Sequence, residues 1–76
     1  MPMPTQIRIW WSLLIARGCE ADTLGQLVYL HSVDPDKANS LAWCAATKPG
    51  IKSANGWLGK ATRERLQQME LYPDRL

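Results

Sequence analysis

The stretch from Leu24 to Trp43 constrains the fold most strongly, because it predicts two short helices with almost no chain between them. Apolar residues recur at helical spacing on both sides of a break at Ser32–Val33. Asp34 can cap the second helix, and Pro35 suits its first position, where a missing N–H is tolerated. The apolar positions are Leu24, Leu27 and Val28 before the break, and Val33, Ala38 and Leu41 after it.

Start and stop signals elsewhere predict a helix on each side of this pair. Thr5 can cap the first helix, and Gly18 provides a left-handed stop after it. Asp22 can cap the second helix, and Pro73 stops the last one. Gly25 lies inside the second helix and predicts a close approach by a neighbouring helix. The four predicted ranges are Thr5–Arg17, Thr23–Ser32, Pro35–Thr47 and Trp57–Tyr72.

Length and composition indicate one globular domain. The 76 residues predict a single helical domain spanning 1–76, with an extended lead-in at 1–4 and a short tail at 73–76. The segment 51–56 is predicted as coil with an Asn55-Gly56 turn signal. An apolar share of 46% is ordinary for a folded chain and excludes a disordered one. We therefore expect an all-α fold, a compact bundle of four short helices.

The first helix has an unusually wide apolar arc. Its helical stripe consists of Ile7, Trp10, Trp11, Leu14 and Ile15. Ile9 and Leu13 widen this stripe to about two-thirds of the circumference, whereas a helix at the edge of a small domain needs roughly a third to a half. We expect the helix to be central in the core. The alternative is an apolar face covered by a protein partner or, in a homodimer through Ile9, Trp10 and Leu13, by a second copy.

The central pair resembles the helix-turn-helix superfamily over about 20 residues. The resemblance is carried by Val33 at the apolar slot of the turn, by Asp34-Pro35 at the start of the second helix, and by Ala38 and Leu41 on its inner face. It implies that the bundle contains a helix-turn-helix-like unit whose second helix reads the major groove. The implied function is a small phage- or plasmid-type transcription regulator that binds double-stranded DNA.

Under this resemblance the outer face of the second helix contacts bases, and the basic segment that follows contacts phosphates. Residues 48–65 carry a net charge of +4, which suits a polyanion but is also typical of a solvated helix face. Two acids at the start of the reading helix, Asp34 and Asp36, depart from the pattern because phosphates repel them. The predicted DNA-binding residues are Lys37, Asn39, Ser40, Trp43, Lys48, Lys52, Lys60 and Arg63.

The alternative function is a small protein-binding module that acts as an inhibitor or adaptor of a host protein or complex. It accounts for the wide apolar arc of the first helix and for Trp43, a large aromatic among short polar residues. Aromatic anchors with few charges around them are typical of protein interfaces. Trp43 is predicted either to be exposed as such an anchor or to be covered by another part of the chain.

Several classes of function find no support in the residues. The single histidine, His31, has no second ligand nearby, and the sequence shows neither a nucleophile elbow nor a Gly-rich phosphate loop. Cys19 and Cys44 lack metal-ligand spacing, so we expect reduced thiols in a cytoplasmic protein. The apolar run Ile9–Ala16 is too short to span a bilayer. We therefore expect no enzyme activity, no metal, no cofactor and no membrane insertion.

Overall fold

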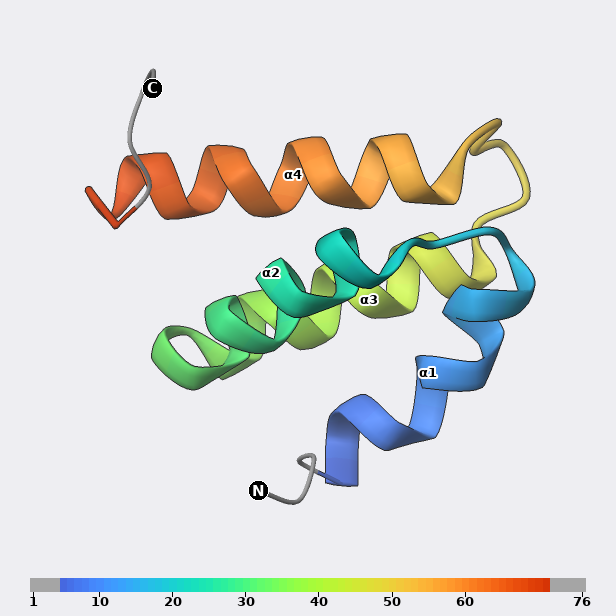
Figure 1. The fold of residues 1–76 in the computed structure, drawn as a ribbon, viewed down its shortest axis with the longest axis horizontal. Helices are drawn as coiled ribbons and strands as arrows, with labels where there is room; N and C mark the ends of the chain where they lie inside the picture. The colour runs from blue at the N-terminus through green and yellow to red at the C-terminus, as the bar shows by residue number, and fades with distance from the viewer. Residues whose placement is uncertain (1–4, 72–76) are drawn as a thin grey trace.

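The computed structural model describes residues 5–71, and it describes the side chains from residue 8 onward. Within this range the chain forms four α-helices and no strand, which confirms the predicted all-α fold (Figure 1). The helices are α1 (Thr5–Ala16), α2 (Ala21–Val33), α3 (Pro35–Thr47) and α4 (Ala54–Gln68). The predicted lead-in at 1–4 and tail at 73–76 lie outside the described residues.

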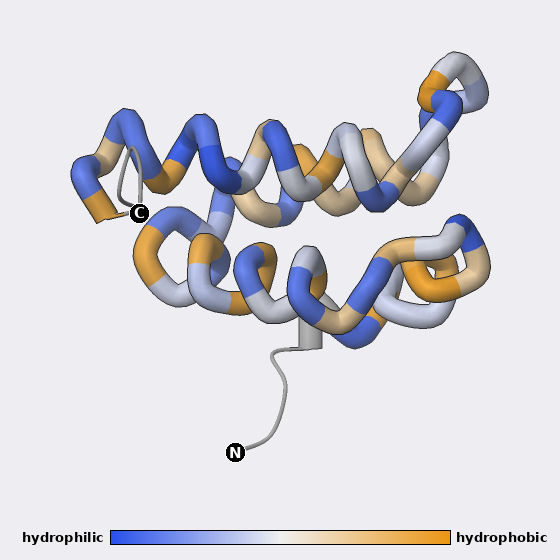
Figure 2. Tube along the Cα trace, turned by 45° about the horizontal axis from the view of Figure 1, so that its top comes forward, coloured by the Kyte–Doolittle hydropathy of each residue, from blue (hydrophilic) through white to orange (hydrophobic). Residues whose placement is uncertain are grey.

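α3 is the central helix of the bundle, because it packs against α1, α2 and α4. α2 and α3 lie side by side, with α4 on one side of this pair and α1 on the other (Figure 1). The hydrophilic turns of α4 lie mostly along its outward edge, in line with a helix that buries one side (Figure 2). The largest buried leucines and the alanines of α3 make up most of the core: Leu14, Leu24, Leu27, Leu30, Leu58, Leu66, Ala38, Ala42, Ala45 and Ala46.

The expectation that the first helix is central is wrong. α1 buries Trp10 and Leu14, and Trp11 packs half-buried against the same core. Ile15 was expected on the same stripe, yet 52% of its surface is exposed. The reason is that only one neighbouring side of α1 is occupied, so a narrow stripe suffices to attach it. Most of the buried residues of α3 are alanines, and their small side chains let three helices approach α3 closely.

α1 and α4 end in the same way, with a residue in the left-handed conformation after the last turn. After α1, Gly18 adopts a φ of 90° and the N–H of Cys19 donates to the Leu14 carbonyl at 3.0 Å, which confirms the predicted left-handed stop. After α4, the N–H of Leu71 donates to the Leu66 carbonyl at 2.8 Å. Glu70 takes the left-handed position there with a φ of 60°, although it carries a side chain. α4 therefore ends before the predicted Tyr72.

A single residue, Asp34, separates α2 from α3. Its carboxylate Oδ1 accepts a hydrogen bond from the backbone N–H of Lys37 at 3.3 Å, and its own N–H donates to the Leu30 carbonyl at 2.7 Å. The predicted cap and the predicted range Pro35–Thr47 are thus confirmed. A helix-turn-helix connection takes about 3–4 residues. Val33, expected at an apolar slot of such a turn, ends α2 with 40% of its surface exposed, so that expectation is wrong.

The starts of α2 and α4 differ from the prediction. α2 begins at Ala21, with Glu20 rather than Asp22 at its cap position. α4 begins at Ala54, because the Ser53 hydroxyl accepts a hydrogen bond from the Gly56 N–H at 3.1 Å. The Asn55-Gly56 pair is therefore part of the first turn of α4 and not of a coil. Its dipeptide signal was outweighed by the Ser53 cap, which satisfies a free N–H of the helix start.

Two long-range contacts hold α2 against α4. The Glu20 N–H donates to Asn55 Oδ1 at 2.8 Å, and Asn55 Nδ2 donates back to Glu20 Oε1 at 3.2 Å. Farther along, a Cβ on Gly59 would lie 3.6 Å from the Thr23 hydroxyl oxygen. The close helix approach therefore occurs at Gly59. It does not occur at Gly25, where a Cβ would meet nothing within 4 Å.

Candidate functional site

The predicted DNA-binding residues of α3 do not share one face. Ser40 and Trp43 are exposed, the latter with 60% of its surface, so no described segment covers Trp43. Lys37 is also exposed, and it lines a groove between α3 and α4 together with Leu41. Asn39, expected on the outer face, is half-buried and its side-chain oxygen is buried. The outward surface of α3 is therefore narrower than the resemblance implies.

The predicted phosphate-binding cations are exposed, and none forms an ion pair within the described part of the chain. Lys48 and Lys52 lie in the connection between α3 and α4, whereas Lys60 and Arg63 lie on α4. Arg63 Nη1 lies 3.2 Å from the position of a Cβ on Gly59, the glycine of α4 that faces Thr23 of α2. At about 100° per residue, Trp43 lies on the other half of α3 from Leu41, which lines the groove against α4.

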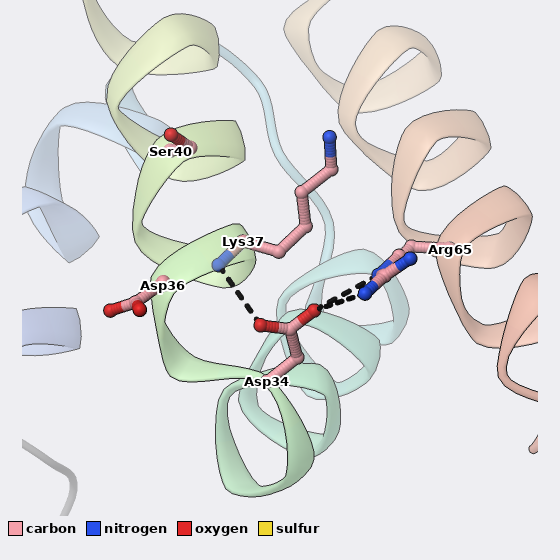
Figure 3. Close-up of a pocket in the computed structure, with 5 residues that line it drawn as sticks. All are labelled: Asp34, Asp36, Lys37, Ser40 and Arg65. Atoms are coloured by element: carbon pink, nitrogen blue, oxygen red, sulfur yellow. Dashed lines mark hydrogen bonds and ion pairs between the residues drawn. The ribbon is translucent and has the colours of Figure 1, made fainter.

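A charged cluster occupies the corner where α2 ends and α3 begins (Figure 3). Asp34 Oδ2 accepts from Arg65 Nε at 2.9 Å and lies 2.9 Å from Arg65 Nη2. The cluster lines a shallow hollow of about 420 Å³ together with Asp36, Lys37 and Ser40. Asp36 points away from Arg65, as Figure 3 shows. Two acids and two cations balance each other here, so the hollow has no preference for a phosphate.

The ion pair with Asp34 reduces the number of cations in the basic segment, residues 48–65, that are free to bind a ligand. The Arg65 hydrogen bond is the main reason that the pKa of Asp34 lies below its ordinary value, and the Lys37 backbone N–H acts in the same direction. Arg65 is thereby committed to a structural contact between α4 and the α2–α3 corner. No local sequence pattern marks this pair, because its members are 31 positions apart.

A second candidate site is the exposed side of α1, here called the α1 surface. The exposed fractions of its aliphatic side chains are 68% for Ile9, 50% for Leu13 and 52% for Ile15. Two small exposed residues, Ser12 and Ala16, lie between them on the helix. Trp10, expected in a homodimer contact with Ile9 and Leu13, is 4% exposed and belongs to the core, so that part of the prediction is wrong. The exposure of Ile15 was not predicted, because Ile15 follows Trp11 by four residues and this spacing also fits the buried stripe of the helix.

The C-terminal end of α1 is tied to the end of α3. Arg17 Nη1 donates to the carbonyls of Ala45 and Lys48, each at 3.1 Å, and so satisfies orphan carbonyls of α3. Cys19 follows in the core, where burial raises the pKa of its thiol and the nearby Arg17 charge opposes that rise. Both cysteines are free thiols, and Cys44 is half-buried. These contacts fix the orientation of α1 on α3 and leave its outer side open.

Among the described residues, no group of three or more His, Cys, Asp or Glu side chains is placed to hold a metal ion. No helix in that part of the chain is long and apolar enough to cross a bilayer. His31 is half-buried on α2. No protein-family model, curated protein or solved structure matches the chain.

Proposed function

We propose that this protein is a small helical protein-binding module, an inhibitor or adaptor that docks through the α1 surface onto an apolar helix of a partner protein. The exposure of Ile9, Leu13 and Ile15 on a single short helix carries the proposal. Single exposed apolar side chains are ordinary on a protein surface, but several on one helix mark an interaction surface.

The energetics of the α1 surface suit docking. Full burial of an aliphatic side chain contributes about 1.5–3 kcal/mol, so each of these half-exposed residues supplies on the order of 1 kcal/mol when a partner covers it. Trp10 and Leu14 already hold α1 on the core. The surface is therefore organised before the partner arrives, which lowers the entropy that binding must overcome.

The composition of the surface also fits a protein contact. Interface centres are depleted of charge, and no charged side chain lies between Ile9, Leu13 and Ile15, where the small residues Ser12 and Ala16 form the middle of the α1 surface. A helix of 12 residues is about 18 Å long, so the contact belongs to the small, transient class of interfaces. Small central side chains leave room for the side chains of an apposed helix, as in helix-in-groove recognition.

The test uses a synthetic amphipathic peptide of roughly 20 residues, long enough to populate a helix, with leucine on one face and glutamine on the other. We expect fluorescence anisotropy to show binding that Leu13→Gln weakens about tenfold, equivalent to about 1.4 kcal/mol. Leu71→Gln is the matched control, since Leu71 is an exposed leucine distant in sequence from α1. Equal affinity of both variants and the parent protein would remove the α1 surface from the proposal.

A second candidate function, DNA binding, is favoured by five of the seven exposed cations outside any ion pair shown within residues 5–71: Lys37, Lys48, Lys52, Lys60 and Arg63. Ser40 and Trp43 would then contact bases from α3. Against it stand the single-residue connection at Asp34, the commitment of Arg65 to Asp34, and the acid Asp36 on the outward side of α3.

A salt titration of duplex affinity decides this second candidate. Phosphate contacts give a log–log slope of about 0.9 per contact, and Lys60→Glu should then abolish binding. A duplex that binds no tighter than about millimolar at low salt eliminates DNA as the partner.

A further inference from the structure

The charges that α1 and the residue after it place beside the α1 surface have one sign. The twelve residues of α1 include one cation, Arg8, and no acid. At about 100° per residue, Arg8 lies beside Ile15 on one edge of the surface, and Arg17 lies beside Leu13 on the other. Both arginines are exposed. The Arg17 hydrogen bond to the Lys48 carbonyl brings the exposed Lys48 to the same end of the surface.

Two hydrogen bonds hold the positive charge of Arg17 at the edge of the α1 surface. Its Nη1 donates to two backbone carbonyls, which hold the guanidinium at the edge of α1 and leave further N–H donors for another partner. The next acid along the chain is Glu20, whose Oε1 accepts a hydrogen bond from Asn55. A partner on the α1 surface therefore meets aliphatic side chains between two arginines.

A second copy of this chain is a poor occupant. An antiparallel pair of α1 helices centred between Ser12 and Leu13 places Arg8 opposite Arg17 of the other copy. A parallel pair places each arginine opposite itself. In both arrangements like charges lie opposite each other, and their repulsion disfavours pairing of two copies.

A lipid surface is also a poor occupant. Helices that lie in a membrane interface combine many Lys and Arg residues with aromatic side chains that anchor in the headgroup region. Here Trp10 is buried and Trp11 is half-buried in the core, so neither is available as a full anchor. The cations near the surface are Arg8, Arg17 and Lys48, below the clusters of about 4–8 that mark anionic-lipid binding.

We propose that the α1 surface binds an acidic amphipathic helix, in which carboxylates flank the apolar side chains that cover Ile9, Leu13 and Ile15. This inference rests on the proposed protein-binding function and adds the charge of the partner to it. The partner's carboxylates pair with Arg8 and Arg17, while its leucines occupy the space above Ser12 and Ala16. Arginine suits this role because its planar guanidinium can bind a carboxylate through two N–H groups.

The experiment compares three peptides of the same length and apolar face, whose flanking positions are all glutamate, all glutamine or all lysine. At about 50 mM salt we expect the glutamate peptide to bind about tenfold tighter than the lysine peptide, with the glutamine peptide between them. The preference should shrink toward about 500 mM salt, where screening is strong. Arg8→Gln should reduce the preference and leave the affinity of the glutamine peptide unchanged. Glu64→Gln, a charge change of the same size and opposite sign on α4, is the control and should leave the preference unchanged.

The outcomes separate the two proposals. If the glutamine peptide binds and the glutamate and lysine peptides bind equally, the charge inference is overturned and the protein-binding function stands. If no peptide binds, both are overturned. Sedimentation that shows a dimer broken by Leu13→Gln overturns the inference in favour of a second copy. Binding to vesicles of anionic phosphatidylglycerol, without binding to the peptides, overturns it in favour of a membrane.

Discussion

α1 and α3 differ little in length, with 12 and 13 residues, but the core uses them in opposite ways. α1 is rich in large aliphatic and aromatic residues and leaves Ile9, Leu13 and Ile15 exposed. α3 is rich in alanine and contacts all three other helices. The position of a helix in a small bundle thus depends on the size of its side chains as well as on their hydrophobicity. The apolar surface of α1 that the core does not use is what remains for a partner.

The largest expected effect separates two adjacent leucines of α1. Leu14→Ala should lower the free energy of unfolding by about 2–5 kcal/mol, because Leu14 is fully buried and its removal leaves a cavity. Leu13→Ala should lower it by less than about 1 kcal/mol, because half of that side chain is already exposed. Urea denaturation of both variants measures the difference. Similar losses would show that α1 is packed on both sides.

The next effect tests the tight packing around α3. Ala45→Leu should lower the free energy of unfolding by about 1–3 kcal/mol, since Ala45 is fully buried and larger side chains force neighbouring helices apart. Ser40→Leu, an equally large addition at an exposed position of the same helix, should change stability little. Thermal unfolding of the two variants provides the comparison. A neutral or stabilising Ala45→Leu would mean that α3 has unfilled space beside it.

The sequence predicted α3 better than it predicted α1, and the reason is physical. Local signals at Asp34-Pro35 fix the start of α3, so its bounds were predictable without knowledge of its neighbours. The position of Ile15 depends on which side of α1 is covered, and a helical wheel does not show this. The Asp34–Arg65 pair joins residues 31 positions apart, so it becomes visible only when α4 is placed against the α2–α3 corner.

Measuring the free energy of unfolding at several pH values tests the Asp34–Arg65 ion pair, which links the start of α3 to α4. The pKa of Asp34 in the folded state is lowered below 3.8, mainly by its hydrogen bond from Arg65. The carboxylate therefore stabilises the fold above about pH 4, and this contribution is lost as the pH falls through the folded pKa. Asp34→Asn should reduce stability at neutral pH, with a difference from the parent that shrinks in acid.

The matched control for this series is Asp36→Asn, an exposed acid in the first turn of the same helix. Urea midpoints of the parent and both variants, taken from about pH 7 to about pH 2, should show the larger neutral loss for Asp34→Asn. Parallel pH profiles for Asp34→Asn and the parent protein would contradict the structural role of the ion pair.

The smallest effect compares the ends of α1 and α4, which use the same stop with different residues. Glu70→Gly should raise the free energy of unfolding by about 1 kcal/mol, because glycine adopts a left-handed φ without the strain of a side chain. Gly18→Ala should lower it by about 1–2 kcal/mol for the converse reason. Differential scanning calorimetry of the two variants measures both signs. A loss of stability in Glu70→Gly would indicate that the Glu70 side chain makes a stabilising contact.

The most direct test of the α1 surface is a map of amide chemical shifts for the isotope-labelled protein titrated with the neutral leucine–glutamine peptide. The account predicts that the largest changes occur at Ile9, Leu13, Ile15 and their neighbours on α1, with α4 little affected. Changes concentrated at Ser40 and Trp43 of α3, or no changes along α1, would contradict the claim that the outer side of α1 is the docking surface.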